Sequence, residues 1–130
     1  MSIGKKNIIF GLGYLILTMS LGMFLAAKLQ DTAWANEPYG ILRATLRSAH
    51  AHGGVEAILN IVIGILLGSL PLNKTLSRLI SIIAIFAAVL HSGMLFLSPF
   101  VPFAHNIVPL GALLLFATVI LMFVAVIKGE

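Results

Sequence analysis

The sequence predicts an all-α membrane protein: a bundle of four transmembrane helices in a single domain over residues 1–130. Hydrophobic residues make up 60% of the 130 residues and charged residues only 9%. The mean hydropathy is +1.11. Four apolar runs each approach the roughly 20 residues that a helix needs to cross a bilayer. The lipid bilayer is therefore the expected environment of the chain.

Each span is bounded by residues that end helices or suit the membrane interface. The expected spans cover about residues 7–27, 45–70, 76–97 and 105–127. A long polar connection follows the first span, and its Trp34 and Tyr39 suit the lipid interface. Pro71 follows the second span and Pro99 follows the third, and proline cannot continue a helix.

The basic residues predict the orientation in the membrane. Four spans bring both termini to one side, and more basic residues fall on that side than on the other. They are Lys5, Lys6, Lys74, Arg78 and Lys128, against Lys28, Arg43 and Arg47. The positive-inside rule therefore predicts cytoplasmic termini, as in a protein of the bacterial inner (plasma) membrane. These residues are scattered at helix ends and form no patch, so no nucleic-acid partner is expected.

Small residues recur along all four spans. They include Gly11, Gly13, Gly22, Gly53, Gly54, Gly64, Gly68, Gly93 and Gly111. Small side chains let helix backbones approach closely in a membrane, so most of these glycines are expected at helix contacts.

Polar side chains that are costly at membrane depth gather in one half of the expected bundle. His50, His52 and Glu56 lie on the second span, and His91 lies near the same end of the third. At about 100° per residue, His52, Glu56 and Asn60 share one helix face, whereas His50 points elsewhere. The two histidines are thus not expected to grip one ion from a regular helix. An intramembrane ionisable residue is by default a candidate functional residue.

Glu56 allows two interpretations. It is either a protonated carboxyl group hydrogen-bonded to His52 or Asn60, or a proton donor or acceptor in a reaction. For His91, a helix–helix hydrogen bond is the alternative to a functional role.

The histidines also suggest a cofactor. The chain has no cysteine, and imidazole ligands without thiolates suit haem iron, copper or zinc. The residues alone leave haem and a mononuclear copper, zinc or iron ion open as the cofactor. Arg43 and Arg47 lie one to two turns outward of the histidines, where they could pair with haem propionates or simply mark the interface.

Several short motifs resemble the styrene oxide isomerase and hydroxylaminobenzene mutase group. They are Ser48-Ala49-His50 with Glu56 six residues after the histidine, the turn from Lys74 to Ile83, and the Gly93 to Pro102 ending. The resemblance covers about residues 8–102. That group has an asparagine where Glu56 stands and a tyrosine where Leu95 stands.

The resemblance implies a small four-helix membrane isomerase, trimeric, that binds haem b through one histidine. In the styrene oxide isomerases ferric iron acts as a Lewis acid on an epoxide, and in the mutases an arylhydroxylamine is rearranged. The expected function is therefore haem-dependent isomerisation of a small apolar substrate. Glu56 and Asn60 are the expected catalytic residues, and the expected cofactor-binding residues are His50, His52, His91, Arg43 and Arg47.

The ligand histidine and the function each keep alternatives. Motif spacing favours His50, which would face outward if haem lay between protomers, whereas the polar helix face favours His52. We take His50 as the iron ligand. The alternative functions are a bis-histidine electron carrier or a gas or haem sensor, with His91 as second axial ligand, and a small proton-coupled membrane subunit.

Overall fold

A computed structural model describes residues 2–36 and 38–128 as helices joined by short connections, and these residues form no strand. Three long elements are single helices: α1 (Ile3–Lys28), α3 (Gly40–Ser69) and α6 (Pro102–Lys128). The fourth is continuous but composite, and consists of α4 (Lys74–Ala88), the π-helical η1 (Val89–Gly93) and α5 (Met94–Leu97). Four helices are long and apolar enough to cross a membrane, as predicted. Helices are expected there because lipid offers backbone groups no hydrogen-bond partners.

The observed helices start earlier than the sequence indicated, most clearly α3 at Gly40 and α1 at Ile3. Two elements were not predicted. A short helix, α2 (Thr32–Ala35), interrupts the polar connection, and Asp31 caps it by accepting from the backbone N–H groups of Ala33 and Trp34. A π-helical turn, η1, interrupts the third span at His91.

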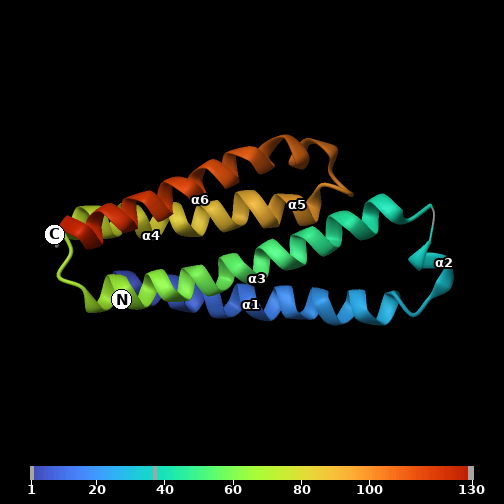
Figure 1. The fold of residues 1–130 in the computed structure, drawn as a ribbon, viewed down its shortest axis with the longest axis horizontal. Coiled ribbons are helices and arrows are strands. Elements are labelled where there is room, and N and C mark those ends of the chain that lie inside the picture. The colour runs from blue at the N-terminus through green and yellow to red at the C-terminus, as the bar shows by residue number, and fades with distance from the viewer. Residues whose placement is uncertain (1, 37, 129–130) are drawn as a thin grey trace.

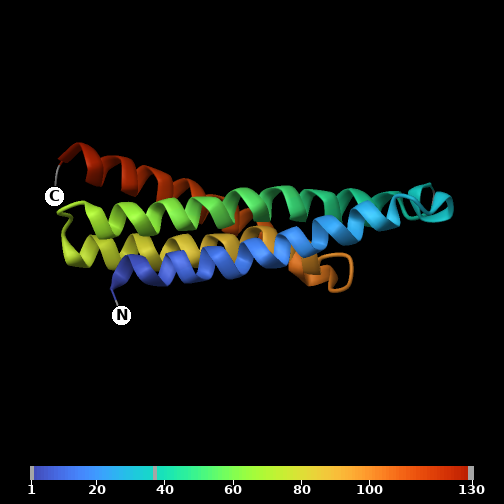
Figure 2. The ribbon, with the colours of Figure 1, turned by 90° about the horizontal axis from the view of Figure 1, so that it is seen from below.

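The helices form two antiparallel pairs (Figure 1), α1 with α3 and α4–α5 with α6. Both termini and the α3–α4 connection lie at one end of the bundle, as an even number of crossings requires. At the other end, α2 and the ends of α1 and α3 extend beyond the α5–α6 turn (Figures 1 and 2).

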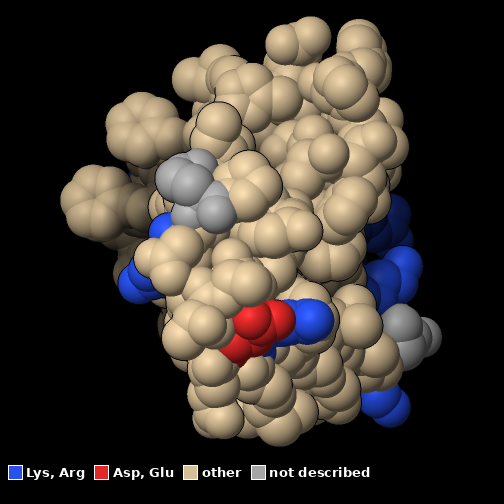
Figure 3. Space-filling view, turned by 90° about the vertical axis from the view of Figure 1, so that its right-hand side faces the viewer, with Lys and Arg blue, Asp and Glu red and all other residues tan. Residues whose placement is uncertain are grey.

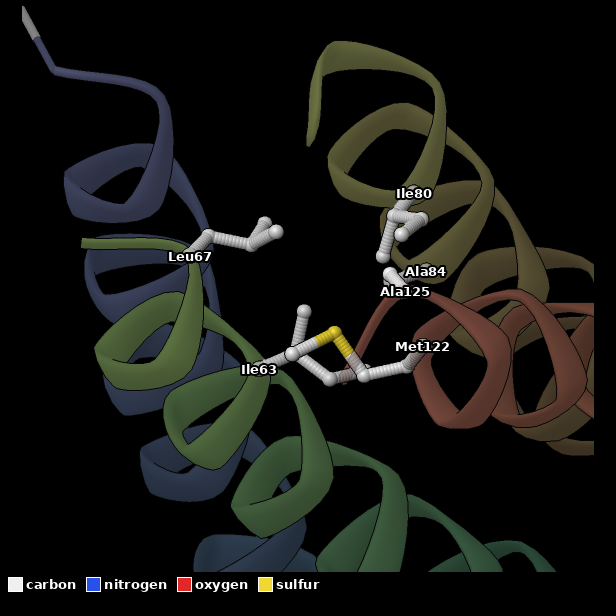
Figure 4. Close-up of a cluster of buried hydrophobic side chains, with 6 residues drawn as sticks. All are labelled: Ile63, Leu67, Ile80, Ala84, Met122 and Ala125. Atoms are coloured by element: carbon white, nitrogen blue, oxygen red, sulfur yellow. The ribbon is translucent and has the colours of Figure 1, made fainter. Parts of the chain in front are cut away.

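The two pairs meet over an apolar core near the end that carries the termini (Figure 4). Its members come from α3, α4 and α6 and are Ile63, Leu67, Ile80, Ala84, Met122 and Ala125. Glycines bring the backbones together, largely as expected. A Cβ atom on Gly4 would lie 2.1 Å from the carbonyl oxygen of Gly64, and one on Gly111 2.2 Å from the backbone nitrogen of His91. Gly13, Gly54 and Gly68, by contrast, have open space around them.

Candidate functional site

A hydrogen-bonded network centred on Glu56 links three helices inside the bundle. Glu56 is 1% exposed. One of its carboxylate oxygens contacts the His91 Nδ1 atom, and the other accepts from the Ser92 hydroxyl. The Tyr14 hydroxyl lies 2.8 Å from the Ser92 Oγ atom. We call Tyr14, Glu56, His91 and Ser92 the Glu56 network.

The protons of the Glu56 network have a definite direction when Glu56 is ionised. A carboxylate only accepts hydrogen bonds, so the Ser92 proton points to Glu56. The Tyr14 proton then points to Ser92, or to the Ala88 carbonyl at 3.3 Å. Every hydroxyl proton in the network is thus directed away from bulk lipid and towards the bundle interior.

A second polar layer lies closer to the termini. The Asn7 amide donates to the Asn60 side-chain oxygen at 3.0 Å and to the Ser81 carbonyl at 3.1 Å. The Asn60 amide donates to the backbone carbonyls of Glu56 and Ala84. All five residues that contribute side chains or carbonyls here are buried. Asn60 therefore links three helices by hydrogen bonds. It borders neither of the two cavities described below, so its position is that of a structural residue.

The structure corrects the expected partners of Glu56. We expected its carboxyl group to bond to His52 or Asn60, but it bonds to His91 and Ser92, which both lie in the π-helical turn η1. His52 is exposed and packs its ring edge-on against His91, with ring centroids 4.8 Å apart. The helix–helix hydrogen bond considered for His91 is present. Among the described residues, no three His, Asp or Glu side chains converge to hold a metal ion.

The His50 ring, expected to face outward if haem lay between protomers, is half-buried. It packs against α1, where its Nδ1 atom lies 2.7 Å from the Thr18 carbonyl oxygen. Gly22 leaves room for the ring, since a Cβ atom there would lie 2.5 Å from the His50 Cε1 atom. A carbonyl only accepts, so Nδ1 carries the proton and Nε2 keeps the lone pair of the neutral ring.

His50 also borders an open groove of about 670 Å³ along α1 and α3. The groove is lined mainly by small or apolar side chains, and its further polar residues are Arg47, Ser48 and His52. Its α1 side consists of Gly22, Leu25 and Ala26, with Leu29 directly after the helix. Arg47 is exposed at this groove. We call it the His50 groove.

Arg43 lies elsewhere and has a structural partner. Its guanidinium group donates to the backbone carbonyls of Trp34 and Ala35 at the end of α2. These contacts hold α2 on the bundle, so the expected pairing of Arg43 with a propionate conflicts with its position. Figure 3 views the end that carries α2 and shows few charged side chains on a mostly uncharged surface.

A separate cavity of about 620 Å³ lies between α1, α2, α3 and α5. We call it the aromatic pocket, because Phe24, Trp34, Phe96 and Phe100 line it. Tyr14 and Ser92 of the Glu56 network also line it. On α3, four groove residues (Ala44, Arg47, Ser48 and Ala51) fall on the face opposite to the pocket residues Leu42, Leu46 and Ala49, and the other two, His50 and His52, lie at the sides between these faces.

Tyr14 and Ser92 were not among the predicted site residues. Tyr14 is a tyrosine inside an apolar span and Ser92 follows His91, which are weak signals in the sequence. Asn7 was missed as well. A polar amide in an apolar span is itself a sign of a hydrogen bond between helices, because lipid offers the amide no partner. No protein-family model, no curated protein and no solved structure matches the chain. Its function must therefore be inferred from these side chains.

Proposed function

We propose that this chain is an integral membrane haem b protein with His50 as the iron ligand, and that it isomerises a small apolar substrate. The observation that carries the proposal is the His50 ring, whose Nδ1 atom is engaged by the Thr18 carbonyl beside an open groove. Histidines that ligate metals commonly donate their second ring N–H to a backbone carbonyl or carboxylate, which fixes the tautomer and the ring orientation.

The other histidines are less suited to this role. His91 uses Nδ1 for Glu56 and lies against His52, inside the bundle. His52 borders the same groove but has no side-chain hydrogen bond to orient its ring. The resemblance to the small membrane isomerases independently favours His50, through Ser48-Ala49-His50. Two unrelated arguments thus favour the same residue.

The His50 groove has the size and composition for a flat cofactor. Its volume of about 670 Å³ lies within the range of small-molecule and cofactor sites. Small side chains leave space beside the ring, and Arg47 supplies a guanidinium group for a propionate. When bound, ferric haem would supply a Lewis acid that polarises a substrate oxygen. His50 would hold the iron, and Thr18 would keep the ring in place.

The surroundings of the groove support the remaining parts of the proposal. Residues of α1 and α3 line it, with Leu29 directly after α1, so a small apolar substrate in the bilayer would reach it along these two helices. A neighbouring copy in a homo-oligomer, expected from the resemblance to be a trimer, would cover it. The excess of basic residues at the end with the termini favours a cytoplasmic position for both, in a bacterial inner membrane.

Absorption spectra of the purified protein test the iron ligand. The wild-type protein is expected to show a Soret band after expression with a haem precursor or titration with hemin. His50→Ala should abolish that band, whereas His52→Ala should keep it. Gly22→Ala should weaken haem binding, since its Cβ atom displaces the His50 ring. Gly13→Ala on the same helix, with nothing within 4 Å, is the matched control.

Two outcomes contradict the proposal. A protein that purifies without colour and gains no band with hemin excludes haem binding. Loss of the band in His52→Ala alone would assign the iron to the other histidine. A five-coordinate spectrum supports the isomerase and a six-coordinate low-spin spectrum the electron carrier. Conversion of an aryl epoxide to an aldehyde, or rearrangement of an arylhydroxylamine, then measures isomerisation directly.

The Glu56 network favours a second candidate, a small proton-coupled membrane subunit. A buried carboxylate paired with His91, next to the exposed ring of His52, connects the interior of the bundle to its surface. Carboxylate and histidine chains of this kind carry protons in membrane proteins. A protein without haem that conducts protons in liposomes, and loses conduction in Glu56→Gln, would favour this candidate.

A further inference from the structure

We infer that the aromatic pocket is a separate binding site for a small uncharged aromatic molecule that carries one hydroxyl group, such as a phenol. The pocket shares no lining residue with the His50 groove, so this inference does not depend on haem. It follows from the volume of the pocket, from the aromatic side chains that line it and from the direction of the hydroxyl protons of Tyr14 and Ser92.

The walls favour an aromatic ligand. Phe24 and Trp34 meet edge to face, with ring centroids 6.4 Å apart, and Phe96 and Phe100 are tilted at 6.3 Å. Aromatic rings prefer such edge and offset contacts, which a further ring can extend. At about 620 Å³ the pocket has the size of a small-molecule site. A charged ligand is disfavoured because no charged side chain lines the pocket among the residues that the structure describes.

The pocket opens towards lipid. Leu17, Phe24 and Phe100 line it and are themselves exposed. In a protein whose helices span a bilayer, these side chains contact acyl chains or the interface. A molecule dissolved in the membrane therefore enters without crossing water.

The polar groups of the pocket select a hydrogen-bond donor. Thr18 and Ser20 also line it, but their hydroxyl groups donate to carbonyls of their own helix, those of Leu15 and Ile16. With Glu56 ionised, the Ser92 proton is directed to Glu56, and the Tyr14 proton to Ser92 or the Ala88 carbonyl. Tyr14 lines the pocket, and its oxygen, whose proton is already donated, keeps a lone pair that can accept a hydrogen bond. A ligand hydroxyl satisfies it, and an ether or a ketone oxygen does not.

Trp34 provides a direct measurement of ligand binding. It is the only tryptophan of the chain and lines the pocket. Bromine quenches tryptophan fluorescence on contact, so brominated probes report occupancy. The probes are 4-bromophenol, which can donate, 4-bromoanisole, which can only accept, and bromobenzene, which does neither. Concentrations are expressed per volume of detergent or lipid phase at neutral pH, which removes differences in partitioning.

We expect saturable quenching by 4-bromophenol that unbrominated phenol relieves. One hydrogen bond of about 1.4 kcal/mol corresponds to a tenfold preference over 4-bromoanisole. Tyr14→Phe should remove the preference while keeping the ring stacked on Phe10 at 5.2 Å. The matched control is Tyr39→Phe, which changes the other tyrosine of the chain, outside the pocket.

Three results would overturn the inference: quenching that does not saturate, equal affinity for 4-bromophenol and 4-bromoanisole, or an unchanged preference in Tyr14→Phe. The measurement is repeated in His50→Ala. Phenol binding that persists in this variant separates the aromatic pocket from the proposed haem site. If the variant loses both haem and phenol binding, the two are one site and the inference of a separate pocket is wrong.

Discussion

Gly111→Ala is expected to destabilise the protein by about 2 kcal/mol, the middle of the range for overpacking a core. The added Cβ atom would lie 2.2 Å from the backbone nitrogen of His91 and 2.4 Å from the carbonyl carbon of Leu90. Both atoms belong to the backbone of the π-helical turn, which cannot rotate aside as a side chain does. Helix α6 must therefore move away from η1, or the turn must change.

Thermal unfolding in detergent, followed by circular dichroism, measures this loss. Gly13→Ala is the control, because a Cβ atom at Gly13 meets nothing within 4 Å. That variant should be neutral, or gain up to about 1 kcal/mol from the higher helix propensity of alanine. Equal melting temperatures for the two variants would show that α6 does not contact η1 closely at Gly111.

Glu56→Ala is expected to destabilise the bundle by about 3 kcal/mol. Side-chain hydrogen bonds between membrane helices average only about 0.6 kcal/mol, so the two lost bonds account for about 1 kcal/mol. The remainder comes from the cavity left by a fully buried side chain and from the unpaired groups of His91 and Ser92. Glu56→Gln keeps the volume and one acceptor oxygen, and should lose about half as much.

The same unfolding measurement applies, with Ser20→Ala as control. The Ser20 hydroxyl is exposed and donates within its own helix, to the Ile16 carbonyl, so its removal should change stability by less than about 0.5 kcal/mol. If Glu56→Ala unfolds at the same temperature as Ser20→Ala, the Glu56 network contributes nothing to the fold.

The four spans could be predicted because hydropathy and length alone decide which segments cross a bilayer. Their starts were less predictable, because the polar residues Arg43 and His105 lie within α3 and α6 rather than before them. Short α2 escaped prediction because its four residues carry no periodic pattern, and its stability depends on the Asp31 cap and on Arg43, which belongs to the following helix.

The candidate site could be predicted only in its residue types. His50, Glu56 and His91 stood out as polar residues in apolar spans, but their partners depend on helix rotation. The π-helical turn shifts the register around His91 and presents His91 and Ser92 together to Glu56. The sequence pattern of the third span did not predict this π-helical turn. The partner of His50 is a backbone carbonyl, which every residue possesses, so composition could not identify it.

The offset between the two helix pairs bears on how the protein sits in lipid. The α1–α3 pair reaches beyond the α5–α6 turn at one end (Figures 1 and 2). The 30 residues of α3 span about 45 Å, whereas the hydrocarbon layer is about 30 Å thick. A flat bilayer cannot match both pairs when the bundle stands upright. Hydrophobic mismatch is relieved by tilt, so the bundle axis should incline from the membrane normal, and more steeply in thinner bilayers.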